Sequence, residues 1–241
     1  MTTPDSRSRS NHTQGAEPAG DAEDDQAAAR PFVVEFAGTP RAGKTTALRR
    51  LRPWLEARGH RVGVVEERAR HCKVPYKRHP DFNLWTASAT VAEILQARYA
   101  GHDVLLVDRG PFDALTWMDW YRRIGLLPDD EHRAIQGYLG GPTLARMIDL
   151  VVMMTVDPAE ALHRELAGGR PHTPGPIINS ATLHTINDAI DAVARSRPDF
   201  RVEHLDTTLT DEFATFAHVS ELVATCLRMS SRAFAQELIG T

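Results

Sequence analysis

The stretch VVEFAGTPRAGKTTALRRL, residues 33–51, joins a β-favouring run to a glycine-bearing loop and then to leucines at helical spacing. Its centre, GTPRAGKT, matches the pattern G-x-x-x-x-G-K-[ST], with Gly38, Gly43, Lys44 and Thr45 at the fixed positions. Glycines let the backbone N–H groups of such a loop point at phosphate oxygens, and the following helix adds the positive end of its dipole. The stretch therefore predicts a loop that binds nucleotide phosphates.

Residues of this loop have distinct expected roles. Lys44 reaches the β- and γ-phosphates, and the Thr45 hydroxyl coordinates Mg²⁺. Arg41, inside the loop, is a candidate to stabilise the phosphoryl group during transfer. We expect the nucleotide to contact Gly38, Thr39, Arg41, Ala42, Gly43, Lys44, Thr45 and Thr46.

A second candidate site follows an apolar run in HDVLLVDRGPFD, residues 102–113. Asp108 comes at the end of this run, where a P-loop protein holds its second contact to Mg²⁺, usually through water. Arg109 is next to it, and its planar guanidinium can hold an acceptor or phosphate oxygen in a fork that lysine lacks. We predict metal binding for Asp108 and a catalytic role for both residues.

Two glutamates follow the strand-like run in VGVVEERAR, residues 62–70. A carboxylate at the end of a neighbouring parallel strand points into the same crevice as Lys44. There it can accept the proton of an acceptor hydroxyl as a general base. The alternative is a surface ion pair with a following arginine. We favour Glu67 as the base and leave Glu66 open.

An arginine-bearing loop is predicted in TVDPAEALHRELAGGRPHTPG, residues 155–175. A proline begins a helix there, and a Gly-Gly, proline-rich segment follows it. Arg164 and Arg170 can close over the transferring phosphate, exclude water and neutralise charge, as a lid over residues 164–176. Solvated arginines before a turn are the alternative.

Apolar runs and amphipathic segments alternate along the chain after residue 31. We predict strands at Phe32–Ala37, Val62–Val65, Val104–Val107, Leu150–Thr155 and Val202–Leu205. This alternation indicates an α/β fold, a doubly wound parallel five-stranded sheet with helices on both faces. Pro53 predicts a kink or an early end in the helix after the phosphate loop.

The chain divides into a tail and a single domain by composition. Residues 1–30 contain no Val, Ile, Leu, Phe, Tyr or Trp, so they cannot offset the entropy of ordering and are predicted to be disordered. Residues 31–241 form the predicted domain, with a C-terminal helix from about residue 210.

Composition restricts the partners. A net charge of −4 gives no reason to expect a duplex nucleic-acid partner, and no stretch is apolar enough for a membrane span. Two cysteines, Cys72 and Cys226, far apart in sequence, make a disulfide framework unexpected and favour the cytoplasm. We expect a monomer or a small oligomer, such as a homodimer.

The order of these motifs resembles the P-loop kinases of small metabolites, especially deoxynucleoside kinases and thymidylate kinases. It is also similar to nicotinamide-riboside kinase-type domains, in which E…R and DR…D patterns occur, here Glu67–Arg70 and Asp108, Arg109, Asp113. The resemblance covers about residues 32–210. It departs from thymidylate kinases at Pro40, where they have a carboxylate, and at Gly110, where they have an aromatic residue.

The resemblance implies a kinase that uses ATP and Mg²⁺, and the motifs favour a nucleoside-like small-molecule acceptor. A hydroxyl acceptor benefits from a nearby base, which Glu66 or Glu67 supplies. The alternatives are a nucleoside-monophosphate kinase of the thymidylate type and an ATPase or nucleotide-operated switch with no small-molecule acceptor. A phosphotransferase acting on a natural product also remains open, because loops choose the acceptor.

Overall fold

The five strands form one parallel sheet in the computed structural model, which describes residues 30–168 and 177–239. The strand order is β2-β3-β1-β4-β5. The bounds are β1 Phe32–Gly38, β2 Val62–Val65, β3 Val104–Asp108, β4 Leu150–Thr155 and β5 Val202–Asp206. The predicted doubly wound, five-stranded α/β sheet is thereby confirmed. Residues 1–29 of the predicted tail, and residues 169–176 of the predicted lid with Arg170, lie outside the described residues.

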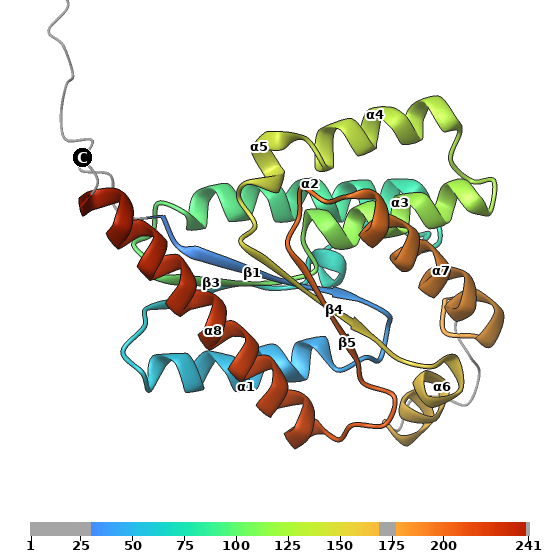
Figure 1. The fold of residues 1–241 in the computed structure, drawn as a ribbon. Coiled ribbons are helices and arrows are strands. Elements are labelled where there is room, and N and C mark those ends of the chain that lie inside the picture. Colours follow the sequence, from blue (N-terminus) through green and yellow to red (C-terminus); the bar gives the residue numbers. More distant parts are fainter. Residues whose placement is uncertain (1–29, 169–176, 240–241) are drawn as a thin grey trace, which may run out of the picture.

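Helices cover both faces of the sheet (Figure 1). One face is covered by α1 (Lys44–Glu56) and α8 (Glu212–Ile239), and the other by α2 (Pro80–Ala97), α3 (Pro111–Arg123) and α7 (Ser180–Ser196). Four shorter elements complete the described part: η1 (Arg68–Arg70), α4 (Asp129–Leu139), α5 (Pro142–Ala145) and α6 (Pro158–Ala167). None of the described helices combines the length and apolar character that a membrane span needs.

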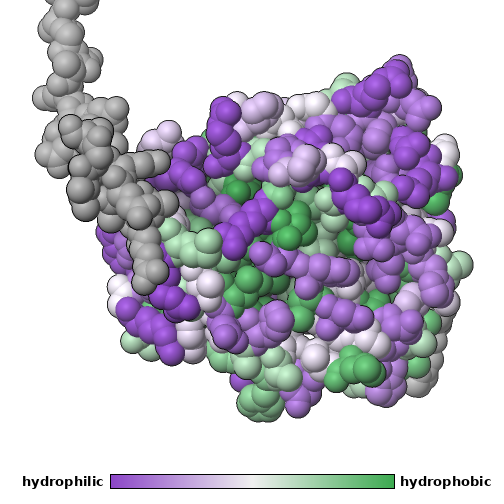
Figure 2. Space-filling model, viewed as in Figure 1, coloured by the Kyte–Doolittle hydropathy of each residue, from purple (hydrophilic) through white to green (hydrophobic). Residues whose placement is uncertain are grey.

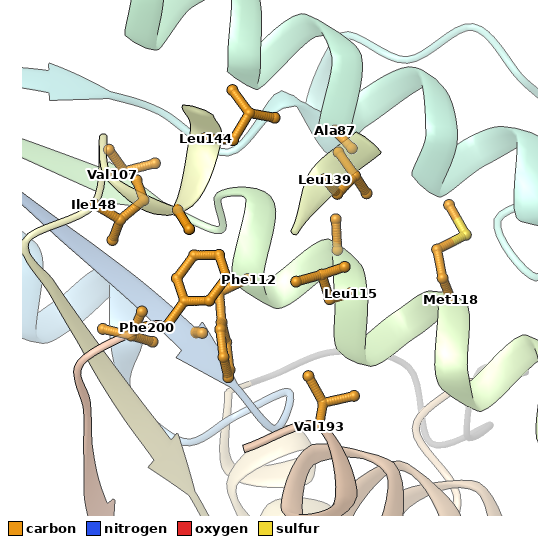
Figure 3. Packing of buried hydrophobic residues seen from close by; sticks show 14 of the residues in the cluster. Ala87, Val107, Phe112, Leu115, Met118, Leu139, Leu144, Ile148, Val193 and Phe200 are labelled. Carbon is orange, nitrogen blue, oxygen red and sulfur yellow. The ribbon is translucent and has the colours of Figure 1, made fainter. Parts of the chain in front are cut away.

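The buried side chains form two clusters, one on each face of the sheet. Successive residues of a strand point to opposite faces, so Val33 joins the cluster under α3 and Val34 joins the cluster under α1. In the first cluster, Phe112 at the start of α3 packs edge-to-face on Phe200, with ring centroids 5.2 Å apart (Figure 3). Burial on both faces explains why the inner strands β3 and β4 are nearly continuous apolar runs.

Helix α1 continues past Pro53 to Glu56. The expectation of an early end was therefore wrong. Leu51 and Leu55, on either side of the proline, are fully buried. Packing against the sheet thus holds the last turn in place although Pro53 donates no backbone hydrogen bond.

The two edge strands of the sheet, β2 and β5, are both short and differ in polarity, since β2 has no polar side chain. Strand β5, one edge, is short and carries the polar residues Glu203, His204 and Asp206, which discourage pairing with another chain. On the face seen in Figure 2, hydrophilic residues surround smaller apolar areas in the middle, over β4 and β5.

All strands are parallel, so the loops after β1, β2, β3 and β4 meet at the carboxyl end of the sheet, where a ligand is expected.

Candidate functional site

The phosphate loop begins in the last residue of β1 and ends in α1. Gly38 has a φ of 118°, and a Cβ at this position would lie 2.1 Å from the Met154 carbonyl oxygen of β4. Only glycine fits both the conformation and this close approach. Arg41 also has a left-handed backbone conformation, with a φ of 68°. The loop therefore curls tightly around the N-terminus of α1, as a phosphate cradle requires.

Lys44 lies buried across this loop. Its Nζ donates to the carbonyl oxygens of Gly38 at 2.9 Å and Thr39 at 2.6 Å. Burial lowers the pKa of Lys44 to about 7, and the positive charge of Arg109 adds to this, while nearby carboxylates oppose it. Anionic phosphates beside the ammonium would favour its charged form.

Thr45 and Asp108 form the candidate metal site. Thr45 Oγ1 donates to Asp108 Oδ2 at 2.7 Å, and Asp108 Oδ1 is buried without a hydrogen-bond partner. Burial raises the pKa of Asp108, whereas the charge of Arg109 and the Thr45 hydrogen bond lower it. A hydroxyl beside an unpartnered carboxylate oxygen suits Mg²⁺, which binds oxygen ligands.

Few protein ligands are available to such an ion. Among residues 30–168 and 177–239, no group of three or more His, Cys, Asp or Glu side chains could hold a metal. Mg²⁺ commonly takes one or two protein ligands and completes its shell with water and substrate phosphates. The Thr45–Asp108 pair therefore fits a metal that arrives with a nucleotide.

Arg109, in the turn after β3, forms ion pairs with Glu67 after β2 and with Asp113 of α3. Its Nε lies 2.9 Å from Glu67 Oε1, and one terminal nitrogen lies 2.9 Å from Asp113 Oδ2. The other Asp113 oxygen accepts the backbone N–H of Gly38 at 2.9 Å. Burial lowers the pKa of Arg109, but the charges of Asp113, Glu67 and Asp108 outweigh it, so the guanidinium stays charged. Arg109 and the phosphate loop are thus held together through Asp113.

Glu35 is a residue of this network that the sequence reasoning missed. It lies fully buried in β1, and its carboxylate accepts the N–H groups of Gly110 at 3.0 Å, Phe112 at 3.2 Å and Asp113 at 2.7 Å. It therefore binds the first turn of α3, where the helix leaves N–H groups unpaired. Burial raises the pKa of Glu35 to about 8, although these N–H groups oppose the rise.

The fit between Glu35 and Gly110 explains one departure from the thymidylate kinase pattern. A Cβ on Gly110 would lie 2.6 Å from Cδ of Glu35, and no side chain has room there. A signal was available in the sequence, because a glutamate inside the apolar run VVEFAG is unusual in a buried strand.

The two candidate bases lie in different places. Glu67 pairs with Arg109 and lines three cavities beside the phosphate loop. Glu66 is exposed and lines the third of these, of about 290 Å³, together with Glu67, Thr45 of α1 and Asp108 of β3. Glu67 is therefore the carboxylate that the fold brings to Arg109.

Arg164, one of the two predicted lid arginines, already has protein partners. Arg164 lies in α6 and donates to the carbonyl oxygens of Thr207 at 2.6 Å and Arg41 at 3.3 Å. Arg41 in turn forms an ion pair with Glu165 of the same helix. Arg164 thus bridges the phosphate loop to the turn after β5, while Arg170 lies outside the described residues.

Two cavities meet at Glu67 and Arg109, which line both of them. The loop cavity, of about 730 Å³, runs from residues 40–47 to the start of α8 at Thr210–Thr215. The side cavity, of about 380 Å³, is lined by α2 and α3, with Phe82, Asn83 and Trp117 among its walls. Both are lined by Pro40, Glu67, Arg70, Arg109 and Ile178.

Comparison with known proteins gives a likeness in fold. No protein-family model and no curated protein sequence matches the chain. Among solved structures, deoxyadenosine kinase from M. mycoides with the products dCMP and a flexible dCDP bound is similar, with a TM-score of 0.61. The same enzyme with bound dATP has a TM-score of 0.60.

Both comparisons cover 80% of this chain and 100% of the other, at 15% sequence identity. The chain therefore has a P-loop kinase fold of the deoxynucleoside kinase type. This confirms the resemblance that the order of the motifs indicates, at the level of the fold.

Proposed function

We propose that the protein transfers the γ-phosphoryl group of ATP, with Mg²⁺, to a hydroxyl of a nucleoside or nucleoside-like acceptor. The observation that supports this most is the meeting of two cavities at Glu67 and Arg109. One cavity contains the phosphate loop, and the other has walls suited to a small organic molecule. A nucleotide-operated switch needs only the first of them.

ATP binds in the loop cavity in this proposal. Lys44 and the backbone N–H groups of the loop hold the β- and γ-phosphates, and Thr45 and Asp108 hold Mg²⁺. The ion would neutralise charge on the phosphates and help to align them. Arg164 supports the loop through the carbonyl oxygen of Arg41.

The acceptor binds in the side cavity. Phe82 and Trp117 provide apolar surface for a flat ring, and Asn83, Thr86 and Thr90 provide polar groups for hydrogen bonds. The M. mycoides structures, which contain deoxynucleotides, support an acceptor of this size and chemistry.

Glu67 acts as the general base. The acceptor hydroxyl gives its proton to the Glu67 carboxylate as its oxygen bonds to the γ-phosphorus. The bond from that phosphorus to the β–γ bridging oxygen breaks, and ADP leaves with the electron pair. Arg109, beside Glu67, orients the acceptor and offsets negative charge on the transferring group.

A nucleoside-monophosphate kinase is the second candidate. Arg70 and Lys77 line the side cavity, and no ion pair involving either is found in the part of the chain that the structure describes. Two such cations suit an acceptor that carries a phosphate. In that case the nucleophile is a phosphate oxygen, which needs no base.

An ATP-consumption assay with pooled acceptors tests the proposal. Purified protein is incubated with ATP and Mg²⁺, alone and with pools of nucleosides, nucleoside monophosphates or other small alcohols, and mass spectrometry detects added phosphate. We expect the nucleoside pool to stimulate turnover and give a phosphorylated product. A product from the monophosphate pool alone would favour the second candidate. ATP hydrolysis that no pool stimulates and that Lys44→Ala removes would favour an ATPase or switch.

A further inference from the structure

The segment between β2 and α2 is rich in cations that have no acidic partner. From Arg68 to Pro80 the chain contains five Arg or Lys residues and no Asp or Glu. Arg68 pairs with Glu93 of α2, whereas the other four cations form no ion pair with any residue that the structure describes. In a protein with a net charge of −4, this local excess of positive charge attracts anions.

Two of these unpaired cations border the side cavity, Arg70 and Lys77. Arg70 also lines the loop cavity, so it lies where the two cavities meet. Lys77 lines the side cavity but not the loop cavity. The two cations therefore serve different parts of the side cavity.

The fold holds the backbone of Lys77 in a defined place. The hydroxyl of Tyr121 in α3 donates to the carbonyl oxygen of Lys77 at 3.2 Å and accepts from Asn83 Nδ2 at 3.1 Å. Tyr121 is fully buried, so this contact ties the segment to the core. The guanidinium of the next residue, Arg78, lies over the ring of Trp120, 5.7 Å from its centroid.

Helix α3 separates this place from the proposed reaction centre. Asp113, in the first turn of α3, contacts Arg109 and the phosphate loop. Tyr121 comes eight residues later, near the other end of the helix. Eight residues span about 12 Å along a helix axis. The backbone of Lys77 is therefore held towards the end of the side cavity that lies away from Arg109.

An acceptor in the side cavity thus meets different chemistry at its two ends. At one end lies the Glu67–Arg109 pair, and at the other lies the unpaired ammonium of Lys77. The walls between them include Phe82 and Trp117. The flexible stem of a lysine lets its ammonium reach the edge of a ring held between these walls.

Given the proposed transfer to a hydroxyl, we propose that the acceptor is an anionic alcohol. Its hydroxyl reacts at Glu67, and a carboxylate or phosphate at its opposite end pairs with Lys77. A neutral nucleoside would leave the ammonium of Lys77 without a partner in the cavity. A monophosphate whose phosphate is the nucleophile would place its charge beside Arg109 and Arg70 and leave Lys77 unused.

The reaction itself is the one proposed above. The hydroxyl oxygen bonds to the γ-phosphorus, its proton goes to Glu67, and ADP leaves with the electron pair of the broken bond. The product gains a phosphomonoester and keeps its original anionic group. Lys77 binds the acceptor and takes no part in the bond changes.

Matched acceptors that differ in charge test this class. Purified protein with ATP and Mg²⁺ is given neutral nucleosides, nucleosides that bear a carboxylate on the base, and nucleoside 3′-monophosphates, each as a separate pool. We expect an acceptor from one of the charged pools to exceed the best neutral nucleoside in kcat/KM by about tenfold or more. The two charged pools distinguish a carboxylate from a phosphate. Neutral nucleosides that match or exceed both charged pools would overturn the proposal.

Phosphorus NMR of the product identifies the atom that accepts the phosphoryl group. Transfer to a hydroxyl of a nucleoside 3′-monophosphate gives a second phosphomonoester resonance, which is the expected result. Transfer to its phosphate gives the two coupled resonances of a diphosphate, which would overturn the proposal.

Lys77→Ala tests the residue. The variant keeps the backbone carbonyl that binds Tyr121, and its thermal unfolding should match the wild type. The KM for the charged acceptor should rise about tenfold, while kcat and the KM for a neutral nucleoside change less than about twofold. Lys73→Ala is the matched control, because Lys73 is an exposed cation of the same segment that lines neither cavity. Equal effects of the two variants would overturn the proposal.

Equilibrium dialysis without ATP separates this proposal from the proposed reaction. Base-carboxylated nucleosides or nucleoside 3′-monophosphates that bind the wild type about tenfold more tightly than Lys77→Ala, without turnover, would support the anion site and contradict phosphoryl transfer. Turnover of neutral nucleosides, with no binding of either charged probe that depends on Lys77, would support the transfer and overturn the anion site.

Discussion

Glu67 is the single residue on which the proposed reaction depends most directly, because it lies where the two cavities meet and pairs with Arg109. Glu67→Gln keeps the size of the side chain but cannot accept a proton. We expect kcat to fall by about 100-fold or more, the usual effect of losing a general base. The KM for ATP should change less than about twofold, since Lys44 and the loop hold the phosphates.

The neighbouring carboxylate supplies the control. Glu66 is exposed and lines neither the loop cavity nor the side cavity. Steady-state kinetics of Glu66→Gln should therefore match the wild type within about twofold. A large loss in Glu66→Gln with an unaffected Glu67→Gln would show that the base has been assigned to the wrong residue.

The protonation of Glu35 predicts a pH-dependent stability. Burial raises its pKa from 4.5 to about 8, so folding takes up a proton between these values. Its contribution to stability is complete below pH 4.5 and is lost as the pH rises through 8. Glu35→Gln lacks this titration.

Denaturant unfolding of both proteins at pH 6 and pH 8 measures the effect. The free energy of unfolding of the wild type should fall relative to Glu35→Gln by about 1 to 2 kcal/mol between these pH values. Parallel pH dependences would mean that the three N–H donors keep Glu35 ionised in the folded protein.

At the scale of elements, β1 and α3 are fitted to each other through Glu35 and Gly110. The φ of Gly110 is −106°, so its backbone is open to other residues and the carboxylate alone excludes a side chain. Gly110→Ala should destabilise the protein, whereas the same change in a Glu35→Ala background should cost much less. We expect a coupling free energy of about 1 to 3 kcal/mol from the four unfolding curves.

Additive effects in this cycle would contradict the fit. Glu35→Ala removes the acceptor of three N–H groups, that of the N-cap residue Gly110 and two in the first turn of α3, so it is destabilising by itself, and only the coupling tests the steric argument. A second observable is the KM for the acceptor, because Gly110 follows directly after Arg109, the residue proposed to orient the acceptor.

The strands could be predicted from the sequence because a buried parallel strand leaves a continuous apolar run, as in Leu150–Thr155. The continuation of α1 past Pro53 could not, because packing of Leu51 and Leu55 outweighs the local preference of proline. Local patterns describe a segment in isolation, and contacts made by distant segments can override them.

For the whole molecule, the phosphate loop and Asp108 were identifiable as candidates because the spacing of the loop and the strand before Asp108 follow the chemistry of nucleotide binding. The partners of Arg164 and Glu35 were not, because the chain brings Thr207 and Gly110 beside them only after folding. Which of Glu66 and Glu67 pairs with Arg109 also depended on the fold, since adjacent side chains at a strand end differ in direction.

Ligand binding to the whole domain gives a prediction that needs no knowledge of the acceptor. A ligand at about 100 times its dissociation constant stabilises the folded state by about 2.7 kcal/mol. For a chain of this size that corresponds to a rise in Tm of about 5 to 10 °C. We expect ATP with Mg²⁺ to produce it in thermal unfolding, and Lys44→Ala to remove it.

Asp108→Asn separates the contribution of the metal to the rise in Tm from that of the nucleotide. Its amide is a weaker ligand for Mg²⁺, while the phosphate loop remains intact, so ATP with EDTA should give the same small rise in Tm as in the wild type. The additional rise on adding Mg²⁺ should be reduced or lost, because the buried Asp108 carboxylate beside Thr45 is its proposed origin. A full Mg²⁺-dependent rise in Asp108→Asn would place the metal ligand elsewhere, and no rise with ATP in the wild type would contradict nucleotide binding itself.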